Sequence, residues 1–232
     1  MPQLTIAATD GSGSFGAYLA EPKTPRGGTV VLIQEIFGVN QAMRALCDWV
    51  ADMGYFAVAP DLFWRIEPGL DLNDTVEPEL ARAFQLFGQF DQAKGIEDLT
   101  ATLAVARKLP GANGRVGTMG FCLGGRLAFR MATGSDADCN ISYYGVGLEG
   151  LLADVPKISA PLLLHIAEAD KFVPPAAQAA ILAGVAGNPL IAAHVYPGAD
   201  HAFARIGSPA WNALAATIAN GRTAEMLERC LG

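Results

Sequence analysis

Three side chains in this sequence could together perform nucleophilic chemistry on an acyl group: Cys122, Asp170 and His201. A cysteine attacks as its thiolate, so it needs a neighbouring group that takes the proton. His201 could take or return that proton, and Asp170 could hold the imidazole in the useful tautomer. The chain order, with the nucleophile first, the acid second and the histidine last, is one in which such triads occur.

Cys122 lies at the centre of residues 120–124, which read Gly-Phe-Cys-Leu-Gly, between an apolar run and a helical pattern. This spacing predicts a sharp strand-to-helix turn that lifts the sulfur above the sheet edge. We expect Gly120 and Gly124 to let backbone segments pass where a Cβ atom would clash. The alternative is a structural one, because a free cysteine in a glycine-rich turn is often a small buried hydrophobe.

Each candidate side chain follows a run that is predicted to form a buried strand, and so does Glu35. These runs are residues 29–33, 116–119, 161–167 and 191–196. In an open α/β sheet, ligands bind beyond the carboxyl ends of the strands, so we expect all four side chains at one rim. Taken singly, Asp170 could be a helix N-cap before Pro174, and His201 a turn residue that caps the last helix. The occurrence of Cys122, Asp170 and His201 at three strand ends, in the order that such a triad requires, favours an enzyme.

The rest of the pattern predicts one doubly wound α/β domain over residues 1–232, with a mostly parallel sheet and helices on both faces. Residues 4–8 and 15–20 are predicted to form an antiparallel hairpin, and residues 64–76 an irregular covering segment. Helices are expected after Asn40, over residues 77–90 and 91–109, after Cys122, from Pro174-Pro175, and from about Ser208 to Leu231.

Composition excludes several classes of function. The 232 residues include 16 basic and 23 acidic side chains, and this net charge of -7 argues against a nucleic-acid partner. Residues 1–5 lack the features of a secretory signal, and no apolar run reaches the length of a membrane span, so we expect a cytoplasmic protein without a membrane partner. The four scattered cysteines predict reduced thiols and no metal site. Cys47, Cys139 and Cys230 are interpreted as packing, and His165 and His194 as buried, hydrogen-bonded strand residues.

The chain resembles the dienelactone hydrolase (carboxymethylenebutenolidase) family of the α/β-hydrolase fold, and the resemblance covers nearly its whole length. The residues that carry it are Gln34-Glu35-Ile36-Phe37-Gly38-Val39-Asn40, Pro60-Asp61-Leu62, Gly120-Phe121-Cys122-Leu123-Gly124-Gly125, Tyr143-Tyr144-Gly145, Asp170-Lys171-Phe172-Val173-Pro174 and His201-Ala202-Phe203-Ala204-Arg205. The combination of residues 34–40 with residues 120–125 is quite specific for this family.

The resemblance implies that a Cys122–His201–Asp170 triad hydrolyses small enol-lactones carrying a carboxylate, through an acyl-thioester and without a cofactor or metal. It implies that Glu35 hydrogen-bonds the resting thiol and helps to deprotonate it; the alternative for Glu35 is a structural ion pair with an arginine. The backbone N–H groups of Ile36 and Leu123 are the implied oxyanion hole.

The resemblance also implies that Arg205 binds the substrate carboxylate, and a guanidinium can do so bidentately. The alternative is a surface arginine at a helix start. We expect a monomer with a small-molecule lactone or ester as its partner, in the breakdown of aromatic compounds.

The sequence departs from the family pattern at positions that are expected to bind the substrate or line its pocket. Leu80 stands where a second substrate-binding arginine is expected, and Arg82 and Arg65 are the remaining candidates. Ala202 replaces a small hydroxyl residue, and Phe84 and Phe87 predict a more apolar pocket. A broader esterase or thioesterase acting on neutral small esters is therefore the alternative. A non-catalytic ligand-binding or redox-sensing protein is a third, and fast reaction of Cys122 with iodoacetamide would favour it.

Overall fold

The computed structural model describes residues 4–232, which form two compact units. The first runs to Val116 and includes Leu231–Gly232, and the second is Gly117–Cys230. Each unit combines β-strands with helices packed on them, as the predicted α/β class requires. The prediction of one domain over residues 1–232 stays a prediction. Residues 1–3, part of the stretch in which the sequence shows no secretory signal, lie outside the described residues.

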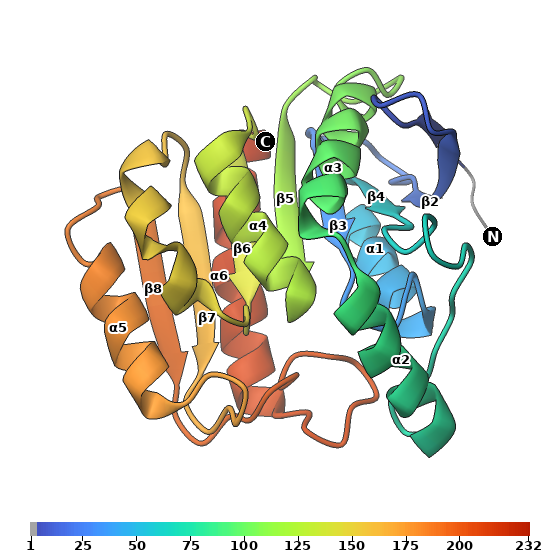
Figure 1. Ribbon diagram of the computed structural model, residues 1–232. Helices are drawn as coiled ribbons and strands as arrows, with labels where there is room; N and C mark the ends of the chain where they lie inside the picture. The colour runs from blue at the N-terminus through green and yellow to red at the C-terminus, as the bar shows by residue number, and fades with distance from the viewer. Residues whose placement is uncertain (1–3) are drawn as a thin grey trace. The chain divides into compact units, whose positions relative to one another are not determined.

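The first unit contains four neighbouring strands in the order β1-β2-β4-β3 (Figure 1). Its elements, in chain order, are β1 (Leu4–Ala7), β2 (Ser14–Ala20), β3 (Thr29–Ile33), α1 (Gln41–Asp52), β4 (Phe56–Pro60), α2 (Glu77–Gln89) and α3 (Gln92–Ala106). The hairpin β1–β2 is antiparallel, with Leu4 opposite Ala17, which confirms the prediction. Strand β2 is antiparallel to β4, and β3 is parallel to β4.

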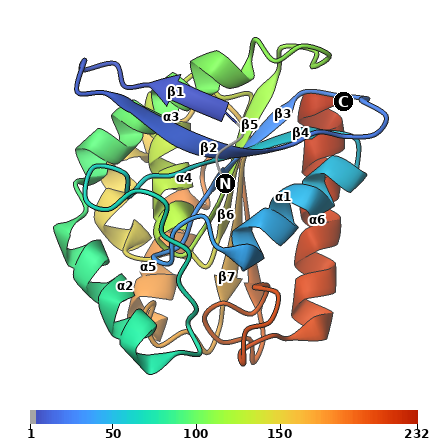
Figure 2. The ribbon, with the colours of Figure 1, turned by 90° about the vertical axis from the view of Figure 1, so that its right-hand side faces the viewer.

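Helices α1 and α3 pack on opposite faces of this sheet (Figure 2). Successive residues of a strand point to opposite faces, so neighbouring residues of β2 contact different helices. Ala17 packs in a cluster with Ala101 of α3. The Tyr18 hydroxyl donates to Asp48 of α1 at 2.9 Å. With helices on both faces, every residue of β3 and β4 is buried. This explains the unbroken apolar runs of the two strands.

Side-chain caps fix where the helices of this unit begin. The Asn40 side chain accepts a hydrogen bond from the Met43 N–H at 3.1 Å at the start of α1. Asp91 accepts from the Ala93 N–H at 2.8 Å at the start of α3. Such caps satisfy backbone donors that have no partner inside the helix. Both helices begin close to where the sequence predicts.

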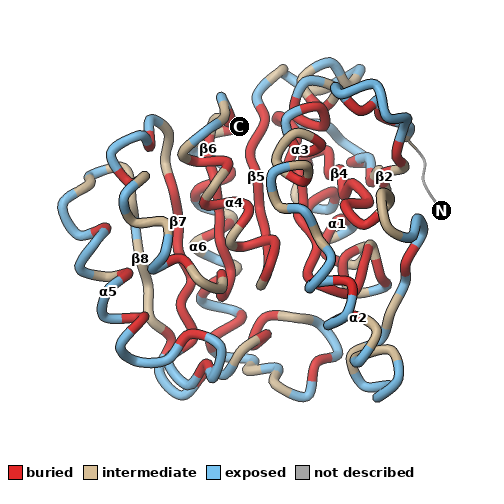
Figure 3. The backbone as a smooth tube through the Cα atoms, in the orientation of Figure 1, coloured by how far each residue is buried: buried red, intermediate tan, exposed pale blue. Residues whose placement is uncertain are grey.

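The second unit contains four parallel strands in the order β5-β6-β7-β8. Its elements are β5 (Val116–Phe121, whose first residue belongs to the first unit), α4 (Leu123–Gly134), β6 (Cys139–Tyr143), the 3₁₀ helix η1 (Leu148–Lys157), β7 (Leu162–Ala167), α5 (Pro175–Val185), β8 (Ile191–Tyr196) and α6 (Ala213–Leu231). Helices α4 and α5 cover one face of these strands and α6 the other (Figures 1 and 2). Strands β6 and β7 are fully buried, whereas β8 is partly exposed at the edge (Figure 3).

Two features of this unit differ from the sequence expectation. Helix α6 begins at Ala213 and not near Ser208. Residues 208–211 form a single turn instead, closed by the Trp211 N–H donating to the Ser208 carbonyl at 3.0 Å. The Asn212 N–H then donates to the Phe203 carbonyl at 3.0 Å and folds the chain back. The Asn212 side chain then accepts from the Ala215 N–H at 3.1 Å and caps the helix. The 3₁₀ helix η1 was also not predicted.

Candidate functional site

The turn around Cys122 has the strained geometry that the sequence predicts. Cys122 is the single residue between β5 and α4, and its backbone adopts φ 56° and ψ -114°. A Cβ atom on Gly120 would lie 1.9 Å from the Gly124 carbonyl oxygen, so only glycine fits there. At Gly125 a Cβ atom would lie 2.7 Å from the Tyr143 carbonyl oxygen. A backbone in such a region costs about 1–3 kcal/mol and is maintained where surrounding structure enforces it.

Asp170 lies just beyond the end of β7 and is buried, at 3% exposure. One carboxylate oxygen, Oδ1, accepts from the Phe172 N–H at 2.8 Å. The other, Oδ2, is 2.7 Å from Nδ1 of His201. Asp170 does not cap α5, since Pro174 occupies the N-cap position of that helix. The carboxylate is therefore fixed by one backbone donor and one imidazole.

His201 lies in the turn that follows β8 and is hydrogen-bonded to both Asp170 and Cys122. It does not cap the last helix, which begins only at Ala213. Burial acts to lower the pKa of His201, but its hydrogen bonds and electrostatic interactions with Asp170 and Cys122 outweigh burial and raise that pKa to about 10. The arrangement thus favours an imidazolium between a carboxylate and a sulfur.

Two aromatic rings hold the imidazole from its sides. Tyr144 meets it edge-on with ring centroids 5.1 Å apart, and Phe172 does the same at 4.8 Å. Tyr144 has a positive φ of 39°, which is uncommon for an aromatic residue. Neither contact was predicted, although both rings belong to segments that carry the family resemblance. Phe172 is two residues after Asp170 and Tyr144 directly follows β6, and these positions could have indicated that both rings lie near the site.

Arg205 lies in the same turn as His201 and is partly buried. Its backbone N–H donates to the Ala202 carbonyl at 3.0 Å. Ala202 is fully buried with φ 63°, so a small residue at this position allows the tight turn. The structure therefore places Arg205 within the second unit, in the loop that carries the imidazole. Its proposed role in substrate binding stays a prediction.

Leu123 is the first residue of α4, so its N–H has no partner inside the helix. This leaves the donor available for an anion at the helix N-terminus. In the first unit, Glu35 and Ile36 follow β3 and are buried, at 5% and 6% exposure. The neighbouring Gln34 side chain accepts from the Leu62 N–H at 3.1 Å and anchors this loop. The roles assigned to Leu123, Glu35 and Ile36 stay predictions.

The two other arginine candidates are engaged within the first unit. Arg82 on α2 forms an ion pair with Glu67. Arg65 donates to both carboxylate oxygens of Asp98, at 2.7 and 3.0 Å. A substrate carboxylate would have to displace these partners. Phe84 and Phe87 on α2 are exposed, at 47% and 37%.

The remaining histidines and cysteines give a mixed result. His165 is buried and hydrogen-bonded to Tyr196 at 2.8 Å and to Thr223 at 3.1 Å, as predicted. His194 is only partly buried in the edge strand β8, so the prediction that it is buried is wrong. Cys47 is buried in α1, as expected of a packing residue. Cys139 and Cys230, by contrast, contact one another.

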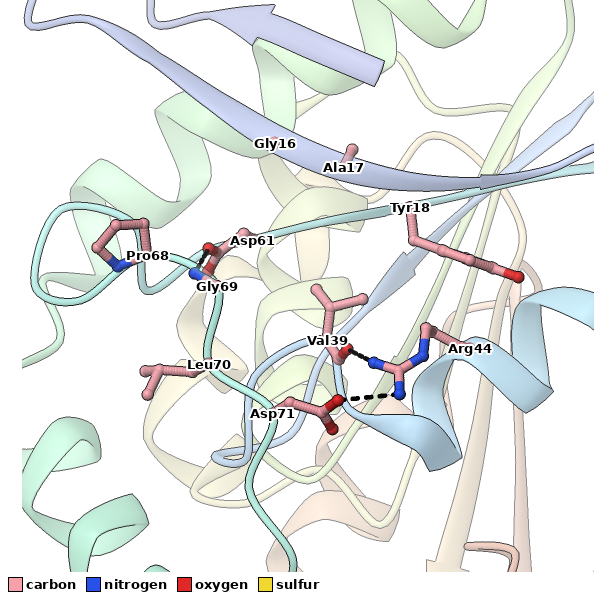
Figure 4. Close-up of a pocket in the computed structure, with 10 residues that line it drawn as sticks. All are labelled: Gly16, Ala17, Tyr18, Val39, Arg44, Asp61, Pro68, Gly69, Leu70 and Asp71. Atoms are coloured by element: carbon pink, nitrogen blue, oxygen red, sulfur yellow. Dashed lines mark hydrogen bonds and ion pairs between the residues drawn. The ribbon is translucent and has the colours of Figure 1, made fainter. Parts of the chain in front are cut away.

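A separate cavity of about 480 Å³ lies in the first unit. Figure 4 shows it with its lining residues. The charged groups around it already have partners: Arg44 donates to the Val39 carbonyl at 2.7 Å and pairs with Asp71 at 2.9 Å. Asp61 accepts from the Gly69 N–H at 2.7 Å and from the Phe63 N–H at 3.0 Å. These contacts hold the loop after β4 at the wall of the cavity.

Within residues 4–232, no group of three or more His, Cys, Asp or Glu side chains could hold a metal ion. No helix in this described part of the chain is long and apolar enough to span a membrane.

Comparison with known proteins identifies the family to which the chain is similar. The model of the dienelactone hydrolase family matches residues 15–231. A relative from Azospirillum brasilense, provisionally named a carboxymethylenebutenolidase, is 51% identical over 235 residues that cover 100% of both chains. The carboxymethylenebutenolidase of Pseudomonas putida is 42% identical over 97% of this chain and 94% of its own. A solved structure from Klebsiella pneumoniae, provisionally named a dienelactone hydrolase, has a TM-score of 0.81 and 26% identity, covering 97% of this chain and 96% of its own. These matches confirm the predicted α/β-hydrolase fold.

Proposed function

Since the chain belongs to the dienelactone hydrolase family and is a hydrolase, we propose that it opens small enol-lactones that carry a carboxylate, as in the conversion of dienelactone to maleylacetate. The reaction is proposed to proceed through a thioester on Cys122. The observation that carries this proposal is the contact of His201 with both Cys122 and Asp170, the latter at 2.7 Å.

In the proposed first step, the Cys122 sulfur attacks the lactone carbonyl carbon as a thiolate. The ring C–O bond breaks, the enol oxygen takes the proton held on His201, and the acyl group remains on sulfur. In the second step, the now neutral His201 removes a proton from water, and the water oxygen attacks the thioester carbon. The C–S bond then breaks, Cys122 leaves as a thiolate beside the protonated His201, and the product leaves as a carboxylate after losing a proton to solvent. Asp170 keeps the Nδ1 proton of His201 directed toward its own carboxylate, so the other ring nitrogen serves the sulfur and the water.

The tetrahedral intermediate of each step carries a negative oxygen. The proposed donors are the N–H groups of Leu123, at the N-terminus of α4, and of Ile36. Donors of this kind act where charge develops, and losing one typically costs about 10²–10³ in rate. We propose that Glu35 accepts a hydrogen bond from the resting thiol and helps to deprotonate it when substrate displaces the carboxylate. The burial of Glu35 on the loop after β3 supports this role.

A test of the proposal is hydrolysis of cis- and trans-dienelactone by the wild-type chain and by Cys122→Ala. We expect the variant to lose at least about 10³-fold in kcat, because the sulfur forms the bond to the acyl group. Rapid acid quenching and intact-mass measurement should detect an acyl adduct on the wild type alone. Full turnover by Cys122→Ala would remove the central claim, and Cys47→Ala serves as the matched control.

A second candidate is a broader esterase or thioesterase acting on neutral small esters. The ion pair of Arg82 with Glu67 and the exposed rings of Phe84 and Phe87 on α2 favour it. A panel of carboxylated lactones, neutral lactones and p-nitrophenyl esters separates the two candidates. The first requires a higher kcat/KM for the carboxylated members, and the second requires no such preference.

A further inference from the structure

Two cysteines outside the proposed catalytic group form a pair. Cys139 is the first residue of β6, and Cys230 lies in the last turn of α6. Helix α6 runs against the direction of the strands, so its end comes beside the start of β6 (Figure 1). The two thiols share a hydrogen bond. The expectation that both cysteines only fill space is therefore incomplete.

The two sulfurs differ in access. Cys139 has no exposed surface, whereas Cys230 is only partly buried. A small oxidant dissolved in water can therefore reach Cys230 first, with Cys139 behind it as a second thiol. Cys122, by comparison, follows β5 and lies at the carboxyl ends of the parallel strands, whereas Cys139 lies at the amino end of β6. The pair is thus separate from the proposed catalytic sulfur.

The charges around the pair favour a thiolate on Cys230. The hydrogen bond from Cys139, and the adjacent Arg229 as donor and positive charge, lower the pKa of Cys230 to about 6, although burial and Asp138 act against them. The hydrogen bond to Cys230 and burial raise the pKa of Cys139 well above its ordinary value. Near neutral pH the pair therefore holds one proton, on Cys139, and one negative charge, on Cys230.

We propose that Cys139 and Cys230 form a redox-active dithiol that a hydroperoxide oxidises to an intramolecular disulfide. The Cys230 thiolate attacks one peroxide oxygen, the O–O bond breaks, and a sulfenic acid forms while hydroxide leaves. The Cys139 sulfur then attacks the Cys230 sulfur, an S–S bond forms, and the sulfenic oxygen leaves as water. Overall, two thiols and one hydrogen peroxide give one disulfide and two waters.

Contact between the two sulfurs is what distinguishes this pair from the other cysteines. A disulfide requires the two Cβ atoms to lie about 3.5–4.5 Å apart, and hydrogen-bonded thiols need only a small further approach. Cys47 is buried in α1, and burial raises its pKa far above the ordinary value, so it should remain a thiol. The inference does not depend on the proposed function, because it uses neither Cys122 nor His201.

The experiment treats the full chain with hydrogen peroxide near neutral pH and follows its mass and thiol content. The Cys122→Ser variant removes the other reactive sulfur, and the wild-type chain is treated in parallel. We expect the Cys122→Ser protein to lose two hydrogen atoms and two titratable thiols, and to regain both with dithiothreitol. Proteolysis without reduction should yield one linked peptide pair containing Cys139 and Cys230.

Two further variants make the result specific. Cys122→Ser/Cys230→Ser should form no disulfide, whereas Cys122→Ser/Cys47→Ser should form it as readily as the parent. The proposal is overturned if Cys139 and Cys230 stay reduced, if they are oxidised to separate sulfinic acids, or if the linked peptides contain another cysteine. Because the linked peptide is also sought in the wild type, a misfolded variant does not leave the question open.

Discussion

At the scale of single residues, Asp170 permits a sharp test because its two carboxylate oxygens have different partners. Oδ1 accepts from a backbone N–H and Oδ2 faces Nδ1 of His201. We expect Asp170→Asn to lower kcat by up to about 10⁴-fold, because an amide can donate to the ring and favour the wrong tautomer. The measurement is kcat on dienelactone together with the chemical shifts of the His201 ring.

The matched control for Asp170→Asn is Glu168→Gln. Glu168 is a carboxylate in the same loop, and it accepts from the Gly198 N–H at 2.9 Å without contacting the imidazole. Its replacement should change kcat only a few-fold. If the two variants lost similar activity, Asp170 would be acting through loop structure and not through the tautomer of His201.

Arg205 leads to a prediction about substrate choice. Removing a charge-assisted hydrogen bond typically costs about 1.5–3 kcal/mol, so Arg205→Ala should raise KM about 10- to 100-fold for carboxylated lactones. Neutral esters should be affected much less, and Arg205→Lys should recover only part of the loss. Steady-state kinetics on matched carboxylated and neutral substrates measure the difference. Arg82→Ala, which breaks the pair with Glu67, is the control.

An equal rise of KM for charged and neutral substrates in Arg205→Ala would mean that the side chain supports the turn. A rise for carboxylated substrates in Arg82→Ala would restore Arg82 as an anchor. The two variants together therefore decide which cation, if either, recognises the substrate carboxylate.

At the scale of elements, the start of α6 can be tested through its cap. Asn212→Ala removes the acceptor of the Ala215 N–H, and we expect a loss of about 1 kcal/mol in the free energy of unfolding. Asn212→Asp keeps an acceptor at the helix N-terminus and should retain most of that stability. Urea unfolding measures both. Equal stability of the alanine variant and the wild type would show that the cap is not stabilising.

The same helix shows why some boundaries could be predicted and others could not. Strand β3 could be read from sequence because a continuous run of apolar and β-branched residues suits burial on both faces. Ser208 was an equally plausible helix start, because the hydroxyl of a serine is a good cap. The choice of Asn212 depends on its backbone contact with Phe203, which no local pattern reveals.

Some features of the candidate site could likewise be predicted from the sequence, and others could not. The positions of Cys122, Asp170 and His201 could be predicted because each follows a strand, and parallel strands end at one edge. The contact of Cys139 with Cys230 could not, since nothing in their spacing links the start of β6 to the end of α6. Likewise, the rings of Tyr144 and Phe172 are placed against His201 by packing, and sequence patterns do not encode packing.

At the scale of the whole molecule, the hydrogen bonds of His201 link stability to pH. Its pKa is about 10 in the folded chain, against about 6.5 when unfolded. Below pH 6.5 both states bind the proton, and the stabilisation from the charged imidazole is complete. Between about pH 6.5 and 10 only the folded state keeps the proton, so the free energy of unfolding falls as pH rises. The expected loss is on the order of a few kcal/mol.

The measurement is urea unfolding of the wild type and of His201→Asn at intervals between pH 6 and about pH 10. Other groups titrate in this range, including the thiol of Cys230, so the quantity of interest is the difference between the two proteins. That difference should be largest near pH 6 and should shrink steadily toward pH 10. A difference that stays constant across the range would mean that His201 does not carry its charge between Asp170 and Cys122, and the proposed proton transfer would then have to begin from a neutral imidazole.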